Sequence, residues 1–347
     1  MADEVVFPAR TWALESLSEE EYARWERDGF VALPNRIPLE LCRAAACAVR
    51  EFVGADDNRE ASWYARTLDI YGERCEDGTR PIHGPCGMVQ MFHHDSLWAI
   101  RQCPAAHAAF ADVYGTRRLW VTGDRAHFKP PECALHPAWS DAGPEHSHLH
   151  WDVAPDRAVD FVVQGCVYLE RTACDQGALR VVPRSHRRLG TLRAAGAAAC
   201  EAEAVPVPGE AGTLVLWHSA TLHGPGRNVA HRPRVSAYVA FLPVDAASFR
   251  ASSRANDPNS TTTTADDPAL SLADSGTLQY DVLGSSVPRL SRDRRVERWR
   301  HRLPLLDEDP KEHELERRPP GEHHAEPFAH LSPLGRRLVG LDDWPPD

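Results

Sequence analysis

The first fifty residues alternate between helical and strand-like spacing of apolar side chains. Ser18 followed by Glu21 forms a capping box, Gly29 supplies a helix stop, and Pro38 stands where a second helix can begin. The spacing predicts a helix over 19–27, a strand over 30–33 and an alanine-rich helix over 39–52. The N-terminal part is therefore expected to be helical.

From about residue 84 the pattern changes to short runs of β-forming residues separated by Pro, Gly and Asp. The predicted strands fall within 119–121, 161–169, 179–182, 213–217 and 235–242. These runs are too short and too close together for βαβ units. Short strands with irregular connections favour a mainly β jelly roll with flanking helices, in which two antiparallel sheets face each other and the mouth can hold a small ligand.

The composition of the C-terminal hundred or so residues changes from polar and charged to apolar near the end. Residues 257–266 are polar and low in complexity, and 287–327 are dense in charged residues, His and Pro, so a mobile loop and a solvated tail are expected. Apolar character returns at 331–341 and Trp344, which should dock back onto the core. The predicted division is a helical part, a β core and a C-terminal extension, at 1–83, 84–245 and 246–347.

Composition narrows the classes of partner. The 347 residues have ordinary hydrophobic and charged fractions, which fit one globular core with appendages. The formal net charge of −11 disfavours nucleic acid and anionic membranes as partners. The nine cysteines include no C-x-x-C pair, and the N-terminus lacks a basic region followed by an apolar run, so a cytoplasmic protein with reduced thiols is expected.

One histidine and one aspartate have the spacing of metal ligands. His150 and Asp152 are two residues apart, so on a strand both side chains point to one face. Two histidines and one carboxylate form the facial triad of non-haem Fe(II) oxygenases. His223 is the best third ligand, because it follows an apolar strand and precedes Gly-Pro-Gly. His186 and His218 are expected to make structural contacts instead.

A carboxylate clamp follows the third candidate ligand. Arg234 and Ser236 share one face of the next predicted strand. A guanidinium gives the bidentate, charge-assisted grip that the distal carboxylate of 2-oxoglutarate requires, and the hydroxyl adds a donor. Arg232 is close in sequence but less well placed.

Taken together, these motifs resemble the phytanoyl-CoA dioxygenase (PhyH) family of Fe(II)/2-oxoglutarate-dependent oxygenases over roughly residues 17–243. The matching segments are Leu17-Ser-Glu-Glu-Glu, Asp28-Gly-Phe-Val, His150-Trp-Asp152, Gly177 to His186, Gly212 to Trp217, His223 and Arg234. The resemblance implies a double-stranded β-helix (cupin-like) core, iron on His150, Asp152 and His223, and 2-oxoglutarate on Arg234. Arg184 and Thr213 depart from the residues common in the family, and neither is a predicted ligand.

The function expected from this resemblance is a dioxygenase that uses Fe(II), 2-oxoglutarate and O2. It would hydroxylate a small molecule while 2-oxoglutarate is converted to succinate and CO2. Two alternatives remain open: a non-catalytic β-helix that binds a metal or ligand, and a Zn-dependent hydrolase using the same ligands. Arg234 and Ser236 disfavour the hydrolase, which has no need of a carboxylate clamp.

Other side chains are candidates for the same pocket. Lys129, with Arg125 on the same face, is expected to help hold 2-oxoglutarate or an anionic substrate, unless it belongs to a solvated edge strand. Gln164 and Tyr168 either line the pocket or face the core. His148 is an alternative, cupin-like ligand, but the Glu that such a motif needs is missing after it.

Overall fold

The computed structural model describes residues 7, 10–64, 87–89, 91–136, 139, 149–151, 162–244, 291–301, 305 and 329–345. Asp152, His148 and the predicted polar loop at 257–266 lie outside these residues.

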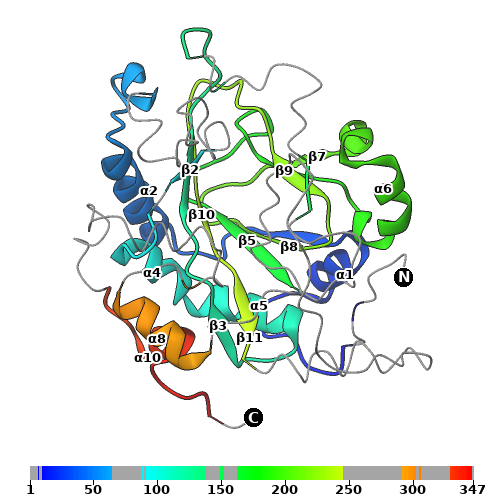
Figure 1. The fold of residues 1–347 in the computed structure, drawn as a ribbon, viewed down its shortest axis with the longest axis vertical. Helices are drawn as coiled ribbons and strands as arrows, with labels where there is room; N and C mark the ends of the chain where they lie inside the picture. Colours follow the sequence, from blue (N-terminus) through cyan, green and yellow to red (C-terminus); the bar gives the residue numbers. More distant parts are fainter. Residues whose placement is uncertain are drawn as a thin grey trace, which may run out of the picture.

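Two antiparallel sheets form the centre of the molecule (Figure 1). The larger has the order β1 (Phe30–Leu33), β8 (Leu214–His218), β5 (Val163–Tyr168), β10 (Arg234–Tyr238), β4 (Ala126–Lys129) and β2 (Met88–Val89). The smaller has the order β7 (Val205–Val207), β6 (Leu179–Val181) and β9 (His223–Pro225). A separate pair joins β11 (Phe241–Pro243) to β3 (Leu119–Val121).

The chain alternates between the two sheets, which identifies a double-stranded β-helix. β4, β5, β8 and β10 belong to the large sheet, and β6, β7 and β9 to the small one. The Tyr168 hydroxyl crosses between them, donating to the Val207 carbonyl at 2.6 Å and accepting from the Leu179 amide at 3.2 Å. The predicted fold class is confirmed.

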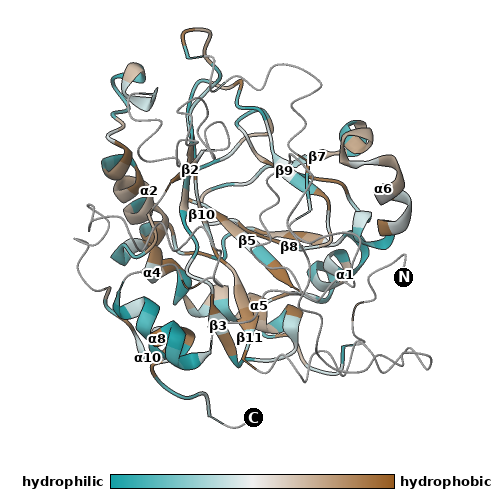
Figure 2. Cartoon of the chain, viewed as in Figure 1, coloured by the Kyte–Doolittle hydropathy of each residue, from teal (hydrophilic) through white to brown (hydrophobic). Residues whose placement is uncertain are grey.

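The N-terminal helices follow the predicted ranges closely. α1 (Glu19–Asp28) carries the Ser18 and Glu21 capping box and ends at Gly29, whose φ of 79° is left-handed. α2 (Leu39–Val53) packs its apolar face against β4 and β10. Figure 2 shows brown, apolar residues along α2 and along the neighbouring strands.

Two helices were missed by the sequence pattern. α4 (Asp95–Arg101) and α5 (Pro104–Tyr114) lie in the part after residue 84 that was assigned to the β core, ahead of its first predicted strand. α5 is buried on almost every side, so its apolar residues show no single stripe that would mark a helix. The predicted strand over 235–242 is wrong as one unit, because the chain leaves the large sheet after β10 and pairs with β3 as β11.

The remaining helices lie outside the barrel. The small sheet is flanked by α6 (Leu189–Ala195) and the 3-10 segments η4 (Ser185–Arg187) and η5 (Ala197–Glu203). α8 (Arg292–Arg300) and α10 (Pro333–Val339) lie together against the β3 side, where the Trp344 indole donates to the Leu119 carbonyl at 3.1 Å. The division at 83/84 and 245/246 stays a prediction. None of the described helices is long and apolar enough to cross a membrane.

Candidate functional site

His150 and His223 are brought together by an antiparallel bridge. Each backbone amide donates to the other residue's carbonyl, at 2.8 and 3.1 Å, so the two residues lie directly opposite each other. Directly opposed side chains share one face of a sheet, and the two ring centroids are 4.7 Å apart. The two predicted histidine ligands can therefore approach one ion.

A hydrogen bond selects the tautomer of His223. Its Nδ1 lies 2.8 Å from the Thr221 carbonyl, which can only accept, so Nδ1 carries the proton. In the neutral ring, Nε2 then carries the lone pair that metal ions bind. The His223 ring is 4% exposed and lies 5.2 Å from the Trp217 ring, so it sits at the wall of the barrel.

The carboxylate predicted to complete the triad is not part of the described structure. Within the described ranges, no cluster of three or more His, Cys, Asp or Glu side chains could hold a metal ion. Asp152 lies one residue beyond Trp151, which is described and buried. The assignment of Asp152 therefore stays a prediction.

β10 directs Arg234, Ser236 and Tyr238 toward the interior of the barrel. Arg234 lies opposite Lys129 of β4, and Ser236 lies opposite both His127 of β4 and Tyr168 of β5. The alternation along the strands places all of these side chains on one face of the large sheet. This face forms a polar wall within an otherwise apolar barrel.

Arg234 is buried at 1% exposure without a carboxylate partner in the described structure. One Nη donates to the Gly177 carbonyl at 2.9 Å, and the other lies 4.0 Å from the Cys166 sulfur. The Arg234 Nε and the Ser236 Oγ are buried and have no hydrogen-bond partner among the described residues. Two donors next to each other therefore remain for a bound acceptor.

The groups around Arg234 do not neutralise its charge. The guanidinium lies 5.5 Å above the Tyr168 ring. Burial raises the pKa of the Tyr168 hydroxyl, and it also raises the pKa of the Cys166 thiol. Both groups are therefore neutral at pH 7. An uncompensated buried cation is unfavourable, and an anionic ligand would relieve that cost.

The structure buries the other candidates to different degrees. Lys129 is fully buried and donates to the Gly226 carbonyl at 2.9 Å. The reading of its strand as a solvated edge is wrong, because β4 lies between β10 and β2. Gln164 is half-buried and lies opposite Trp217 on β8, near the His223 end of the barrel. Arg125 is largely buried, next to Asp124 and above the Phe92 ring at 5.3 Å.

Two features of the inner face of the barrel were not predicted. The Trp217 indole nitrogen is buried with no hydrogen-bond partner among the described residues. Its alternation with Val215 on an apolar strand could have placed it on the inner face. The Gly177 carbonyl, which accepts from Arg234, gave no signal because any residue type supplies a carbonyl.

His186 and His218 occupy a separate, apolar position. Both are fully buried, and the Phe7 ring lies 5.1 Å from the first ring and 5.5 Å from the second. The His218 Nδ1 accepts from the Ala220 amide at 3.0 Å. These contacts agree with the predicted structural role.

The family model described as phytanoyl-CoA dioxygenase (PhyH) matches residues 25–236, which is more than half of the chain. No curated protein matches the chain.

Solved structures resemble the chain at low identity. The epimerase SnoN, in complex with Fe3+, alpha ketoglutarate and nogalamycin RO, has a TM-score of 0.44 at 18% identity, over 65% of this chain and 83% of SnoN. EctD from S. alaskensis has a TM-score of 0.48 at 18% identity, over 70% of this chain and 82% of EctD. The alpha ketoglutarate dependent carbocyclase SnoK has a TM-score of 0.43 at 17% identity, over 67% of this chain and 88% of SnoK.

Proposed function

The chain belongs to the phytanoyl-CoA dioxygenase family of Fe(II)/2-oxoglutarate-dependent oxygenases, and we propose that it hydroxylates a small molecule at a site built from His150, Asp152, His223 and Arg234. O2 is the second co-substrate of this family. The proposal assigns iron to the first three residues and 2-oxoglutarate to Arg234, with Ser236, Lys129 and Gln164 as further contacts.

The buried, uncompensated guanidinium of Arg234 is the observation that carries the proposal. Its Nε and the Ser236 hydroxyl are donors that lack an acceptor among the described residues, and the distal carboxylate of 2-oxoglutarate supplies two oxygens. Lys129 lies directly opposite Arg234 and adds a second positive charge nearby. These cationic and hydrogen-bond-donating groups are the chemical complement of a dicarboxylate.

The two histidines fit Fe(II) as ligands. The Thr221 carbonyl fixes the His223 ring, which keeps the Nε2 lone pair oriented, as outer hydrogen bonds commonly do for metal-binding histidines. We assign the third ligand to Asp152, because residues two apart on an extended chain share one face and a carboxylate beside two histidines makes a facial triad.

Bound iron with 2-oxoglutarate and O2 supplies the oxidising power for C–H hydroxylation, with succinate and CO2 as co-products. The chain's own residues supply ligation, orientation and exclusion of water. Tyr168, Cys166 and Val215 form the buried lining at the Arg234 end, which leaves the His150 end for the substrate. Burial of this lining keeps water away from the co-substrate.

A small molecule is the favoured class of substrate. A net charge of −11 disfavours binding of the phosphates of an acyl-CoA. The enclosed, largely apolar barrel suits a compact ligand held by a few polar groups. Hydroxylation is the default outcome of this chemistry.

Anaerobic reconstitution with Fe(II) and 2-oxoglutarate tests the proposal. We expect the weak visible charge-transfer band of a keto acid chelated to iron. The band should disappear in His223→Ala, and at moderate 2-oxoglutarate in Arg234→Ala. The control Arg232→Ala removes an exposed arginine two residues earlier and should retain the band.

The outcomes separate the rival functions. Bound iron without the band in the wild-type protein would favour a binding protein or a Zn-dependent hydrolase. An unchanged band in Arg234→Ala across the titration would refute the carboxylate assignment. Succinate release on aeration then provides the assay for a substrate screen.

A further inference from the structure

Arg234 must be held at two points to present its Nε to a ligand. The backbone origin of the side chain must be fixed at the start of β10, and its guanidinium must be fixed at the other end. At the guanidinium end, the described structure shows the hydrogen bond to the Gly177 carbonyl, with the Cys166 sulfur and the Tyr168 ring beside it. The residue immediately before Gly177, Gln176, contacts the backbone at the other end, at the start of β10.

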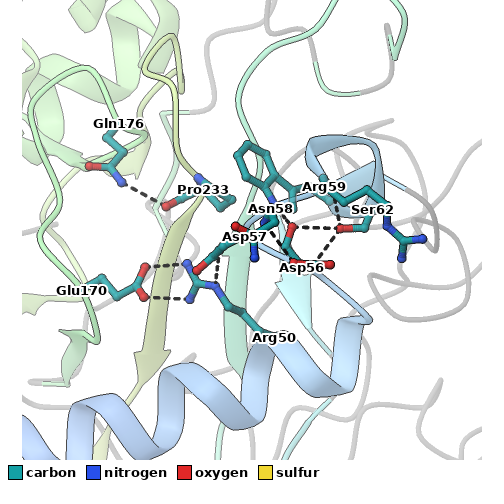
Figure 3. A network of polar contacts seen from close by, with 10 residues as sticks. Arg50, Asp56, Asp57, Asn58, Arg59, Ser62, Glu170, Gln176 and Pro233 are labelled. Atoms are coloured by element: carbon teal, nitrogen blue, oxygen red, sulfur yellow. Dashed lines mark hydrogen bonds and ion pairs between the residues drawn. The ribbon is translucent and has the colours of Figure 1, made fainter.

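The Gln176 side chain bonds to the backbone directly before Arg234. Its Nε2 donates to the Pro233 carbonyl at 3.0 Å, and its Oε1 accepts from the Ala173 amide at 3.1 Å. Figure 3 shows the amide pointing at Pro233 at the start of the strand. Gln176 is only 7% exposed, so both bonds are shielded from competing water.

Gln176 is therefore linked to both ends of Arg234, to its backbone at the start of β10 and to its guanidinium. Its side chain holds the carbonyl of residue 233, and the carbonyl of the next residue in the chain, Gly177, accepts the guanidinium. A shift of this short segment would move both contacts together. Rigid support of this kind is what a preorganised binding group needs.

A second buried amide supports the same region. The Asn228 Nδ2 donates at 2.9 Å to the carbonyls of Lys129 and Arg232. Asn228 is fully buried and pairs with Gln176 through an isolated β-bridge. The end of β4, which carries Lys129, is thereby tied to the turn that enters β10.

The Gln176 segment is also anchored from outside the barrel. Glu170, at the other end of the loop, forms two 2.8 Å contacts with the Arg50 guanidinium, which also donates to Asp57 at 2.9 Å (Figure 3). The loop from Glu170 to Gln176 is therefore attached to helix α2 at one end and to Pro233 at the other.

We propose that Gln176 is a positioning residue for 2-oxoglutarate: it fixes the start of β10 and the carbonyl that orients Arg234, and so sets the affinity of the carboxylate pocket. This inference rests on the proposed function of Arg234. Gln176 itself has no contact with the ligand in this proposal, and it acts through Arg234.

The test replaces Gln176 with leucine, which has similar volume and removes both side-chain hydrogen bonds. The matched control is Gln102→Leu. Gln102 also donates one bond to a backbone carbonyl, that of His330, and accepts one from a backbone amide, that of Ser332. It lies where the C-terminal extension meets the core, away from the barrel.

We expect the Kd for 2-oxoglutarate, measured anaerobically by calorimetry on the Fe(II)-loaded protein, to rise about tenfold in Gln176→Leu, the lower range for loss of an outer-shell contact. Gln102→Leu should bind with wild-type affinity. In succinate assays, Gln176→Leu should raise the KM for 2-oxoglutarate with little change in kcat. A purely structural role would lower the fraction of protein that can bind, seen as a reduced stoichiometry, and leave the Kd unchanged.

Failure of this inference can be distinguished from failure of the proposed function. If the wild-type protein binds no 2-oxoglutarate, the carboxylate pocket is wrong and the inference falls with it. If the wild type binds and Arg234→Ala does not, but Gln176→Leu binds normally, only the positioning role is overturned.

If Gln176→Leu does not fold, Gln176→Glu, which keeps the acceptor oxygen and replaces the donor, provides the second comparison. Unchanged affinity in that variant would also overturn the proposal.

Discussion

Three arginines that the structure buries fully or in large part are stabilised in three different ways. Arg50 pairs with the carboxylates of Glu170 and Asp57. Arg295 on α8 donates to backbone carbonyls, including that of Leu338 at 3.0 Å. Arg234 has one carbonyl, a neutral sulfur and an unpartnered Nε among the described residues. The fewer hydrogen bonds made by the Arg234 guanidinium support its proposed role in binding a carboxylate.

Replacement of Arg234 by methionine should therefore separate stability from binding. We expect Arg234→Met to be no less stable than the wild type when both lack ligand and metal, and more stable by up to about 2 kcal/mol, because an uncompensated buried charge is replaced by an apolar chain. Its affinity for 2-oxoglutarate should be lost. Urea unfolding of the two metal-free proteins measures the first effect. A loss of several kcal/mol would show that the guanidinium is structural.

At the scale of elements, one buried side chain contacts both C-terminal helices and the core. Arg295 is 3% exposed, lies 5.1 Å above the Trp120 ring and donates to the Val121 carbonyl of β3. It also donates to the Leu338 and Val339 carbonyls at the end of α10, at 3.0 and 3.2 Å. One guanidinium thus joins α8, α10 and the β3 edge of the core.

Loss of this guanidinium should loosen the extension without disturbing the barrel. Arg295→Met keeps apolar volume but leaves several carbonyls without a donor, so we expect a loss of about 2 to 4 kcal/mol in local stability. Hydrogen exchange should accelerate in α10 and β3 and stay unchanged in β5 and β8. The control Arg294→Met removes an exposed ion pair with Glu297 on the same helix and should cost less than about 1 kcal/mol. Equal exchange in both variants would contradict the assigned role of Arg295.

Over the whole molecule, the sequence predicted those features that depend on alternation along a strand. Period-two spacing predicted that Arg234 and Ser236 share one face. The structure places both on β10, which pairs with β4 on one side and β5 on the other. Helices α4 and α5 were missed because a helix buried on all sides has no polar stripe. Gln176 could not be predicted, since its partner at Pro233 is 57 residues away and depends on tertiary packing.

The pH dependence of folding is set in part by two buried histidines beneath Phe7. Burial lowers the pKa of His186 to about 4 and that of His218 to about 3. In the unfolded chain both would titrate near 6.5. The unfolded state therefore binds protons first as pH falls, so this stability is fully present above pH 6.5 and declines below it toward the folded pKa values.

A His218→Asn variant should show how much of this decline belongs to one ring, because the Asn carbonyl can accept from the Ala220 amide as Nδ1 does. Each buried neutral histidine adds a slope of up to about 1.4 kcal/mol per pH unit below 6.5. At pH 7.5 the variant should have a smaller free energy of unfolding than the wild type. By pH 5 the difference between the two should have shifted by about 2 kcal/mol in favour of the variant. Urea unfolding of the metal-free proteins at a series of pH values measures the difference. Parallel profiles would mean that His218 takes up its proton as readily in the folded state as in the unfolded one, which would contradict the assigned shift.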